Sequence, residues 1–158
     1  MRRTVGIALF MFAFSPAAVL AQADSATTLS VRRQIEPILQ EQMLAANAHD
    51  TDRFMAAYLH GASLVFVFNG VVYNGWNDLE AQQLKWWNNG KSDVAYVQRG
   101  SAEFTVLSPD VAIVMSPLES RRTLPSGEVS LGQFAVTMVW QKRPEGWRIV
   151  QAHESTVH

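Results

Sequence analysis

The sequence predicts an α+β fold in which N-terminal helices are wrapped by a curved antiparallel sheet that forms a half-open cone. Apolar residues recur at helical spacing early in the chain, and an Asn69-Gly70 pair then marks a β-hairpin. The C-terminal part consists of long alternating segments separated by turns that contain Pro or Gly. Helices followed by a run of antiparallel strands are typical of the α+β class.

A long helix is predicted over residues 31–46, where apolar side chains repeat every three or four positions. Pro37 lies inside this pattern and has no backbone N–H group, so the helix either begins beside it or kinks there. Gln42 shares the apolar face with Ile35 and Leu39. A polar residue at such a position either satisfies a buried backbone group or points into a cavity.

Two shorter helices follow. Asp50 is a suitable N-cap for a helix that ends near Tyr58 or the next residue. Another helix is predicted from about residue 77 to 88, and the sequence Asn88-Asn89-Gly90 is its stop signal.

Aromatic residues are concentrated around this third helix. The side chains of Trp86 and Trp87 diverge by about 100° on a helix, so one is expected to pack into the cone and the other toward its rim or a neighbour. Core packing is the usual role of such residues. Five Trp residues, with Tyr58 and Phe66 nearby, would equally suit a pocket for a flat apolar ligand.

The predicted strands are a hairpin of residues 64–68 and 71–73 and four longer segments at residues 94–107, 111–122, 128–141 and 147–157. Strand alternation divides the last segment into two faces. One face carries Trp147, Ile149, Gln151 and His153, and the other carries Arg148, Val150, Ala152 and Glu154.

The composition is that of a globular protein, with 48% hydrophobic and 17% charged residues among 158. The formal net charge is −1 and no basic cluster is present, which argues against a nucleic-acid partner. The absence of Cys excludes disulfides and thiol chemistry.

Residues 1–23 have the features of a signal peptide. Arg2 and Arg3 form a positive start, residues 5–14 are apolar, and cleavage sites fit after Ala21 or after Ala23. Ten apolar residues are too few to span about 30 Å of hydrocarbon, although an uncleaved N-terminal anchor is the alternative. We therefore expect an exported, periplasmic or secreted bacterial protein, with residues 24–158 as one domain and no membrane association after cleavage.

Several motifs together resemble the nuclear-transport-factor-2-like superfamily, in particular its SnoaL-like branch of small secreted proteins. They are Asn47-Ala48-His49-Asp50, the Asn69-Gly70 hairpin, the Trp-rich helix, and a last strand that starts at Gly146-Trp147 and ends with His153-Glu154. The resemblance implies the cystatin-like or ketosteroid-isomerase-like cone. It also implies which faces of the last two strands point inward, namely those of Phe134, Val136, Met138, Val150, Ala152 and Glu154.

Glu154 is the main candidate for chemistry. A carboxyl group on the wall of an apolar cavity has a raised pKa and can serve as a general acid or base. The alternative is a solvated Glu154 paired with Arg148 or Arg121 at the sheet edge. His153 is a second catalytic candidate, although a lone His on a strand is more often structural, and the spacing of the His residues offers no metal site.

The resemblance to ketosteroid isomerase does not extend to its catalytic groups. Matching the motifs places Gln42 where that enzyme has a Tyr, Phe66 or Val67 where it has a base, and Val136 near the place of its protonated acid. Isomerisation by that route is therefore not expected.

The predicted function is binding of a small, largely apolar molecule in the conical cavity, with no cofactor and no metal. The candidate ligand-binding residues are Gln42, Tyr58, Phe66, Trp86, Trp87, Phe134 and Met138, and the candidate catalytic residues are Glu154 and His153. The alternatives are a Glu154-dependent lyase, isomerase or hydrolase, and an oligomerisation module. A homodimer is expected through the face opposite the cavity, which would carry Thr137, Val139, Trp147 and Ile149.

Overall fold

The structure, a computed structural model, describes the backbone of residues 16–157 and the side chains of residues 25–157. Its helices are α1 (Pro16–Ala48), α2 (Thr51–Met55) and α3 (Trp76–Trp86). Its strands are β1 (Val65–Phe68), β2 (Val71–Asn74), β3 (Ala95–Gln98), β4 (Glu103–Ser108), β5 (Val111–Thr123), β6 (Val129–Arg143) and β7 (Gly146–Thr156). Residues 1–15 of the predicted leader lie outside this range.

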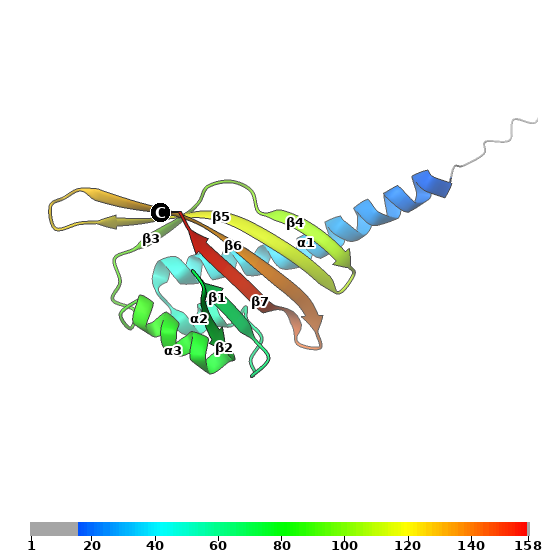
Figure 1. Cartoon of the computed structure of the whole chain (residues 1–158). Coiled ribbons are helices and arrows are strands. Elements are labelled where there is room, and N and C mark those ends of the chain that lie inside the picture. The colour runs from blue at the N-terminus through cyan, green and yellow to red at the C-terminus, as the bar shows by residue number, and fades with distance from the viewer. Residues whose placement is uncertain (1–15, 158) are drawn as a thin grey trace, which may run out of the picture.

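The strands form one curved sheet in the order β2-β1-β7-β6-β5-β3, and β4 also pairs with β5. In the described part of the chain β1 and β7 run parallel, whereas the other paired strands are antiparallel. Figure 1 shows α1 crossing one face of the sheet, with α2 and α3 beside β1 and β2. The predicted α+β class and cone-shaped sheet are confirmed.

Helix α1 is longer than the sequence predicts, because it begins at Pro16 and continues through Pro37. The expectation that Pro37 would lie in the first helical turn is therefore wrong. The Pro37 side chain is exposed, while Val31, Ile35 and Ala45 are buried against the rest of the fold. Packing of this apolar face outweighs the one hydrogen bond that Pro removes.

The N-terminal part of α1 projects beyond the sheet (Figure 1). No helix in residues 16–157 is long and apolar enough to cross a membrane. The leader and its cleavage after Ala21 or Ala23 stay predictions.

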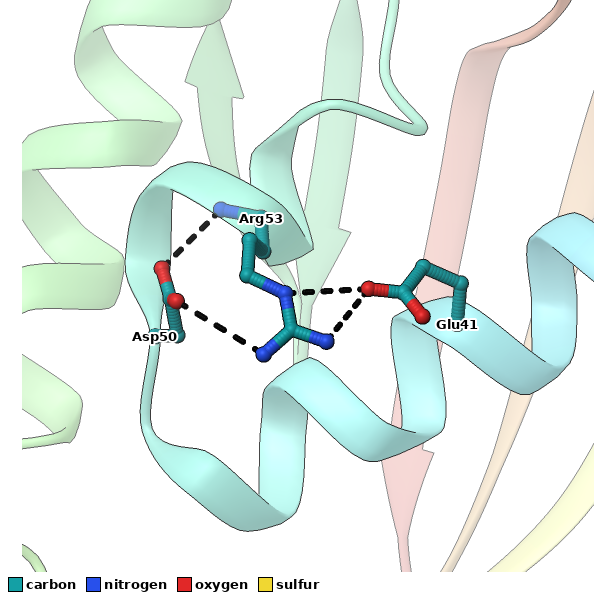
Figure 2. Close-up of polar contacts among 3 residues, drawn as sticks. All are labelled: Glu41, Asp50 and Arg53. Carbon is teal, nitrogen blue, oxygen red and sulfur yellow. Dashed lines mark hydrogen bonds and ion pairs between the residues drawn. The ribbon is translucent and has the colours of Figure 1, made fainter.

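The corner between α1 and α2 is fixed by polar contacts (Figure 2). Asp50 caps α2 as predicted, because its Oδ1 accepts a hydrogen bond of 3.1 Å from the backbone N–H of Arg53. The guanidinium of Arg53 also donates through Nε to Glu41 Oε1 of α1 at 2.9 Å. Helix α2 ends earlier than predicted, since the chain after Met55 pairs with β7, where the N–H of Leu59 donates to the Ile149 carbonyl at 2.9 Å.

The local turn signals are also confirmed. Asn69 and Gly70 have φ angles of 45° and 85°, as the turn between β1 and β2 requires. Asn88, Asn89 and Gly90, with φ angles of 48°, 52° and 81°, follow the end of α3.

The predicted strand of residues 94–107 is instead two strands, β3 and β4, which both pair with β5. The break at residues 99–102 lies beside Pro117 of β5, whose carbonyl accepts a 2.9 Å hydrogen bond from the N–H of Arg99. Pro117 has no N–H group to donate in return, which favours an interruption of the ladder.

A β-bulge in β7 changes which side chains of this strand point inward. Val139 of β6 pairs with Gln151, but the next residue, Trp140, pairs with Ile149, so Val150 is an extra residue. Such a residue reverses the alternation of the faces. The prediction of one unbroken alternation along residues 147–157 is therefore wrong, and Val150 is a half-buried residue that does not line the cavity.

Trp147 and Ile149 consequently lie in the core, with only 3% and 0% of their surface exposed. The indole Nε1 of Trp147 donates to Gln34 Oε1 of α1 at 3.2 Å. These two residues cannot contribute to a dimer face, so the expected composition of that face is wrong. Beyond the bulge, Ala152 and Glu154 point to the same inner side as Trp147 and Ile149.

Candidate functional site

A cavity of about 1140 Å³ lies between the inner face of the sheet and helices α1 and α3. Each of the predicted ligand-binding residues lines it, namely Gln42, Tyr58, Phe66, Trp86, Trp87, Phe134 and Met138. Glu154 lines it as well. The fold thus brings residues from α1, α3, β1, β6 and β7 to one concave site.

The motif after α1 positions one wall of this cavity. The Asn47 side chain forms two hydrogen bonds with the backbone of Tyr96. Its Nδ2 donates to the Tyr96 carbonyl at 3.0 Å, and its Oδ1 accepts from the Tyr96 N–H at 2.8 Å. His49 Nε2 lies 2.7 Å from the carbonyl oxygen of Val94. These contacts fasten β3 to the end of α1 and hold Tyr96 at the cavity.

Trp86 and Trp87 line the cavity from different directions. Trp86 is half-buried, and its ring centroid lies 6.1 Å from that of Phe66 and 5.2 Å from that of Phe68. Trp87 is 2% exposed, and its Nε1 donates to the Tyr96 hydroxyl at 3.0 Å. Although their side chains diverge, Trp86 and Trp87 therefore both contribute to the cavity wall.

Glu154 lies on the inner face, where its neighbours across the sheet are Phe68 and Val136. Its carboxyl group forms no hydrogen bond or ion pair with another described side chain. The two arginines that could have paired with it have other partners, since Arg121 contacts Glu119 and Arg148 donates to backbone carbonyls. Burial away from water raises the pKa of Glu154 to about 7.

Two tyrosine hydroxyl groups are close enough to sense the charge of Glu154. Burial, and then the charge of Glu154, raises the pKa of Tyr58, while a contact with the Gln42 amide acts in the opposite direction. The pKa of Tyr96 is raised mainly by burial, against the hydrogen bond from Trp87. Both phenols stay protonated near neutral pH and can donate hydrogen bonds.

The cavity therefore combines apolar walls with a small set of hydrogen-bonding groups. In addition to Glu154 and the tyrosines, Gln42, Gln83 and Ser116 line it with exposed fractions of 8%, 5% and 6%. Such a surface can orient one polar end of a mostly apolar molecule. A carboxyl group with a pKa near 7 can also accept or deliver a proton there.

His153 does not join Glu154 in the cavity. It is exposed on the outer face of β7, where it pairs with Val67 of β1 and Thr137 of β6. No cluster of three or more His, Cys, Asp or Glu side chains suitable for a metal occurs in the described residues.

Sequence reasoning did not single out Tyr96, Gln83 or Ser116 as lining residues. Gln83 was a detectable signal, because it is a polar residue on the apolar face of a predicted helix. Tyr96 and Ser116 could be assigned only after the register of β3, β5 and β6 was known.

Comparison with known proteins identifies relatives of this architecture. A family model described as a SnoaL-like domain matches residues 35–158. No curated protein matches the chain. Among solved structures, an NTF-2-like protein of unknown function from Shewanella oneidensis is 26% identical, with a TM-score of 0.63 over 78% of this chain and 97% of that chain.

Two further solved structures share the fold at lower identity. An NTF2-like protein with a cystatin-like fold from Novosphingobium aromaticivorans is 17% identical, with a TM-score of 0.70 over 90% of each chain. The association domain of C. elegans CaMKII is 18% identical, with a TM-score of 0.67 over 82% of this chain and 98% of that chain.

Proposed function

Because the chain belongs to the SnoaL-like domain family, we propose that it uses its conical cavity to bind a small, largely apolar molecule. The observation that carries this proposal is the cavity of about 1140 Å³ with aromatic side chains on several sides. Ligand pockets in proteins have volumes of roughly 300–1,000 Å³ and are mostly apolar, with a few polar groups that fix orientation. A partly enclosed cavity such as this one suits a ligand whose body is enclosed and whose end reaches solvent.

Titration with the neutral fluorophore N-phenyl-α-naphthylamine tests this proposal. We expect fluorescence enhancement with saturable, one-site binding to the unmodified protein. Ser116→Phe should weaken binding at least tenfold, because Ser116 is buried on the cavity wall and the added ring occupies ligand space. Ser155→Phe makes the same change at an exposed residue of β7 and should leave affinity unchanged. Equal binding by both variants would place the probe outside the cavity and contradict the proposal.

A second candidate function is acid–base catalysis by Glu154, and the specific observation in its favour is the pKa of about 7 that burial gives this carboxyl group. At neutral pH a substantial fraction of such a group is ionised and can take a proton from a carbon next to a carbonyl group. The resulting acid can return that proton to the product. Many lyase and isomerase reactions use such a step, whereas in a hydrolase the same base would take a proton from the attacking water.

Hydrogen–deuterium exchange tests this candidate without knowledge of the substrate. β-Acetonaphthone, an apolar ketone with exchangeable methyl protons, is incubated with the protein in deuterated buffer and followed by NMR. We expect exchange above the buffer rate, with a pH dependence centred near 7, and its loss in Glu154→Gln. Exchange no faster than in buffer across that pH range would remove the support for base catalysis on this class of compound.

We also propose that the protein is exported to the periplasm or the medium, because residues 1–23 have the features of a leader.

We propose in addition that the protein forms a homodimer through the outer face of the sheet. Apolar residues lie half-buried on that face, namely Val65, Val67, Ile113, Met115 and Val139. An assembly role has a precedent in fold only, since one neighbouring structure is an association domain.

A further inference from the structure

Aromatic residues of the cavity form one connected belt, and Gln83 places an amide group beside it. We propose that this part of the cavity binds a planar ring whose edge carries an amide, with an N–H donor next to a carbonyl oxygen, and that Gln83 recognises that edge. The inference rests on the proposed function, because it names the chemical class of the molecule that the cavity is proposed to bind.

The aromatic belt consists of five cavity-lining residues from α2, β1, α3 and the chain between α2 and β1. Its contacts run from Trp87 to Phe54, Tyr58, Phe66 and Trp86, with ring centroids 5.0, 5.7, 6.3 and 6.1 Å apart in that order. Trp86 and Trp87 are adjacent in sequence, so the chain itself closes the belt at the end of α3. Aromatic rings attract further planar rings at such separations, which makes the belt suitable for a flat ligand ring.

Gln83 lies one helical turn before the two tryptophans. Residues three and four positions apart are neighbours on the surface of a helix, so the Gln83 side chain lies beside both Trp86 and Trp87. Gln83 is 5% exposed and lines the cavity. A polar amide is therefore held among the rings of the aromatic belt.

The Gln83 amide has no hydrogen-bond partner among the residues that the structure describes. Neither of its polar atoms is sealed inside the protein, so both face the cavity space. Polar groups of the belt are engaged elsewhere, since Trp87 Nε1 donates to the Tyr96 hydroxyl at 3.0 Å and the Tyr58 hydroxyl contacts the Gln42 amide. Leaving a buried amide unpaired is unfavourable, so a ligand that pairs with Gln83 gains affinity.

The chemistry of the Gln83 amide selects the kind of edge on the ligand. A Gln side chain carries one acceptor oxygen and one NH₂ donor on the same carbon atom, so a group that satisfies both presents a donor beside an acceptor. A carboxylate only accepts and an ammonium group only donates, and each would leave the other atom of Gln83 unpaired. An amide edge pairs with both atoms, whichever way the Gln83 amide is turned.

Two probes that differ in one N–H group test the inference. 2-Quinolone is a planar cyclic amide, and 1-methyl-2-quinolone carries a methyl group in place of its N–H. Their dissociation constants are measured by isothermal titration. The unmodified protein should bind 2-quinolone at least about tenfold more tightly, because methylation removes the donor and leaves the Gln83 oxygen unpaired. Gln83→Met should shift the ratio of the two constants by about tenfold toward the methylated probe, since Met keeps the length of the side chain and lacks the amide.

Gln82→Met is the matched control, because Gln82 is the neighbouring residue of α3 and does not line the cavity. It should keep the preference of the unmodified protein for 2-quinolone. A shift as large as that of Gln83→Met would assign the effect to α3 as a whole and overturn the inference.

The melting temperature of the unliganded variants provides a second readout. Gln83→Met removes an amide that has no partner in the described part of the chain, so it should melt at the same temperature as the unmodified protein or higher. A clear decrease would show that Gln83 supports the fold, and would overturn the inference.

The remaining outcomes separate the two proposals. If N-phenyl-α-naphthylamine binds but 2-quinolone does not, or if Gln83→Met leaves the ratio of the two quinolones unchanged, the inference is overturned while ligand binding in the cavity stands. If none of the three probes binds, the proposed function fails, and this inference fails with it.

Discussion

Glu154 illustrates how one residue acquires its properties from the fold. Its carboxyl group is surrounded by Phe68, Val136 and two protonated phenols, and no basic side chain of the described residues pairs with it. Burial disfavours the charged form, so its pKa rises to about 7. The raised pKa suits Glu154 for proton transfer near neutral pH. It also lowers the stability of the folded protein at high pH, where the buried carboxyl group is ionised.

The pH dependence of stability should report this residue. The pKa of Glu154 is about 7 in the folded state and 4.5 when unperturbed, so the folded protein binds the proton more tightly. Its contribution to stability is therefore fully present below pH 4.5 and is lost as the pH rises through about 7. Glu154→Gln should remove about 1–3 kcal/mol of this decrease, as measured by urea unfolding at pH 5 and pH 8.

Glu128→Gln, at an exposed position, is the matched control for this measurement. It should retain the pH dependence of the unmodified protein. The same dependence in Glu154→Gln would mean that Glu154 is solvated at the rim of the cavity.

At the level of elements, the corner between α1 and α2 positions several parts of the site. Asn47 and His49 hold β3, while Asp50 starts α2, which carries Phe54 toward the cavity. The three polar residues lie within four positions of each other, so a short motif sets the relative place of three elements. This explains why the motif is a useful marker of the fold.

Substitution of the cap should weaken this corner. Asp50→Ala removes the oxygen that accepts from the Arg53 N–H and should lower the free energy of unfolding by about 1 kcal/mol. Asp50→Asn keeps a capping oxygen but loses the charge, and it should retain most of that stability. Urea unfolding measures both. A loss in Asp50→Asn as large as in Asp50→Ala would assign the effect to the charge interaction with Arg53 and not to the cap.

At the scale of the whole molecule, the outer face of the sheet is the surface proposed for self-association. Its half-buried apolar residues, among them Ile113, Met115 and Val139, lie on adjacent strands β5 and β6. Exposed Thr137 and His153 interrupt them. A mixed surface of this kind is consistent with association of two copies face to face.

Sedimentation velocity at tens of micromolar protein tests this surface. We expect the unmodified protein to be a dimer and Met115→Lys to be a monomer, because a buried unpaired charge at the interface is unfavourable. Leu29→Lys is the control, since Leu29 is a 53% exposed residue of α1 outside the proposed surface, and it should remain dimeric. A monomer for the unmodified protein would rule out the dimer at this concentration.

The sequence by itself determined the features that depend on a few neighbouring residues. The Asn69-Gly70 turn, the Asp50 cap and the stop after α3 were predicted correctly, because their backbone angles and hydrogen bonds are set within the motif. The predicted ligand-binding residues, chosen with help from the family resemblance, line the cavity, whereas Val150, which was also expected to face inward, does not. The role of these residues in binding stays a prediction.

Only the tertiary structure decided the features that depend on distant partners. The bulge at Val150 is set by the register with β6, and it moved Trp147 and Ile149 from the predicted outer face into the core. The split between β3 and β4 lies beside Pro117, and α1 continues through Pro37 because its opposite face is buried. In each case a contact between residues far apart in sequence outweighed the local pattern, and a local pattern carries no information about that contact.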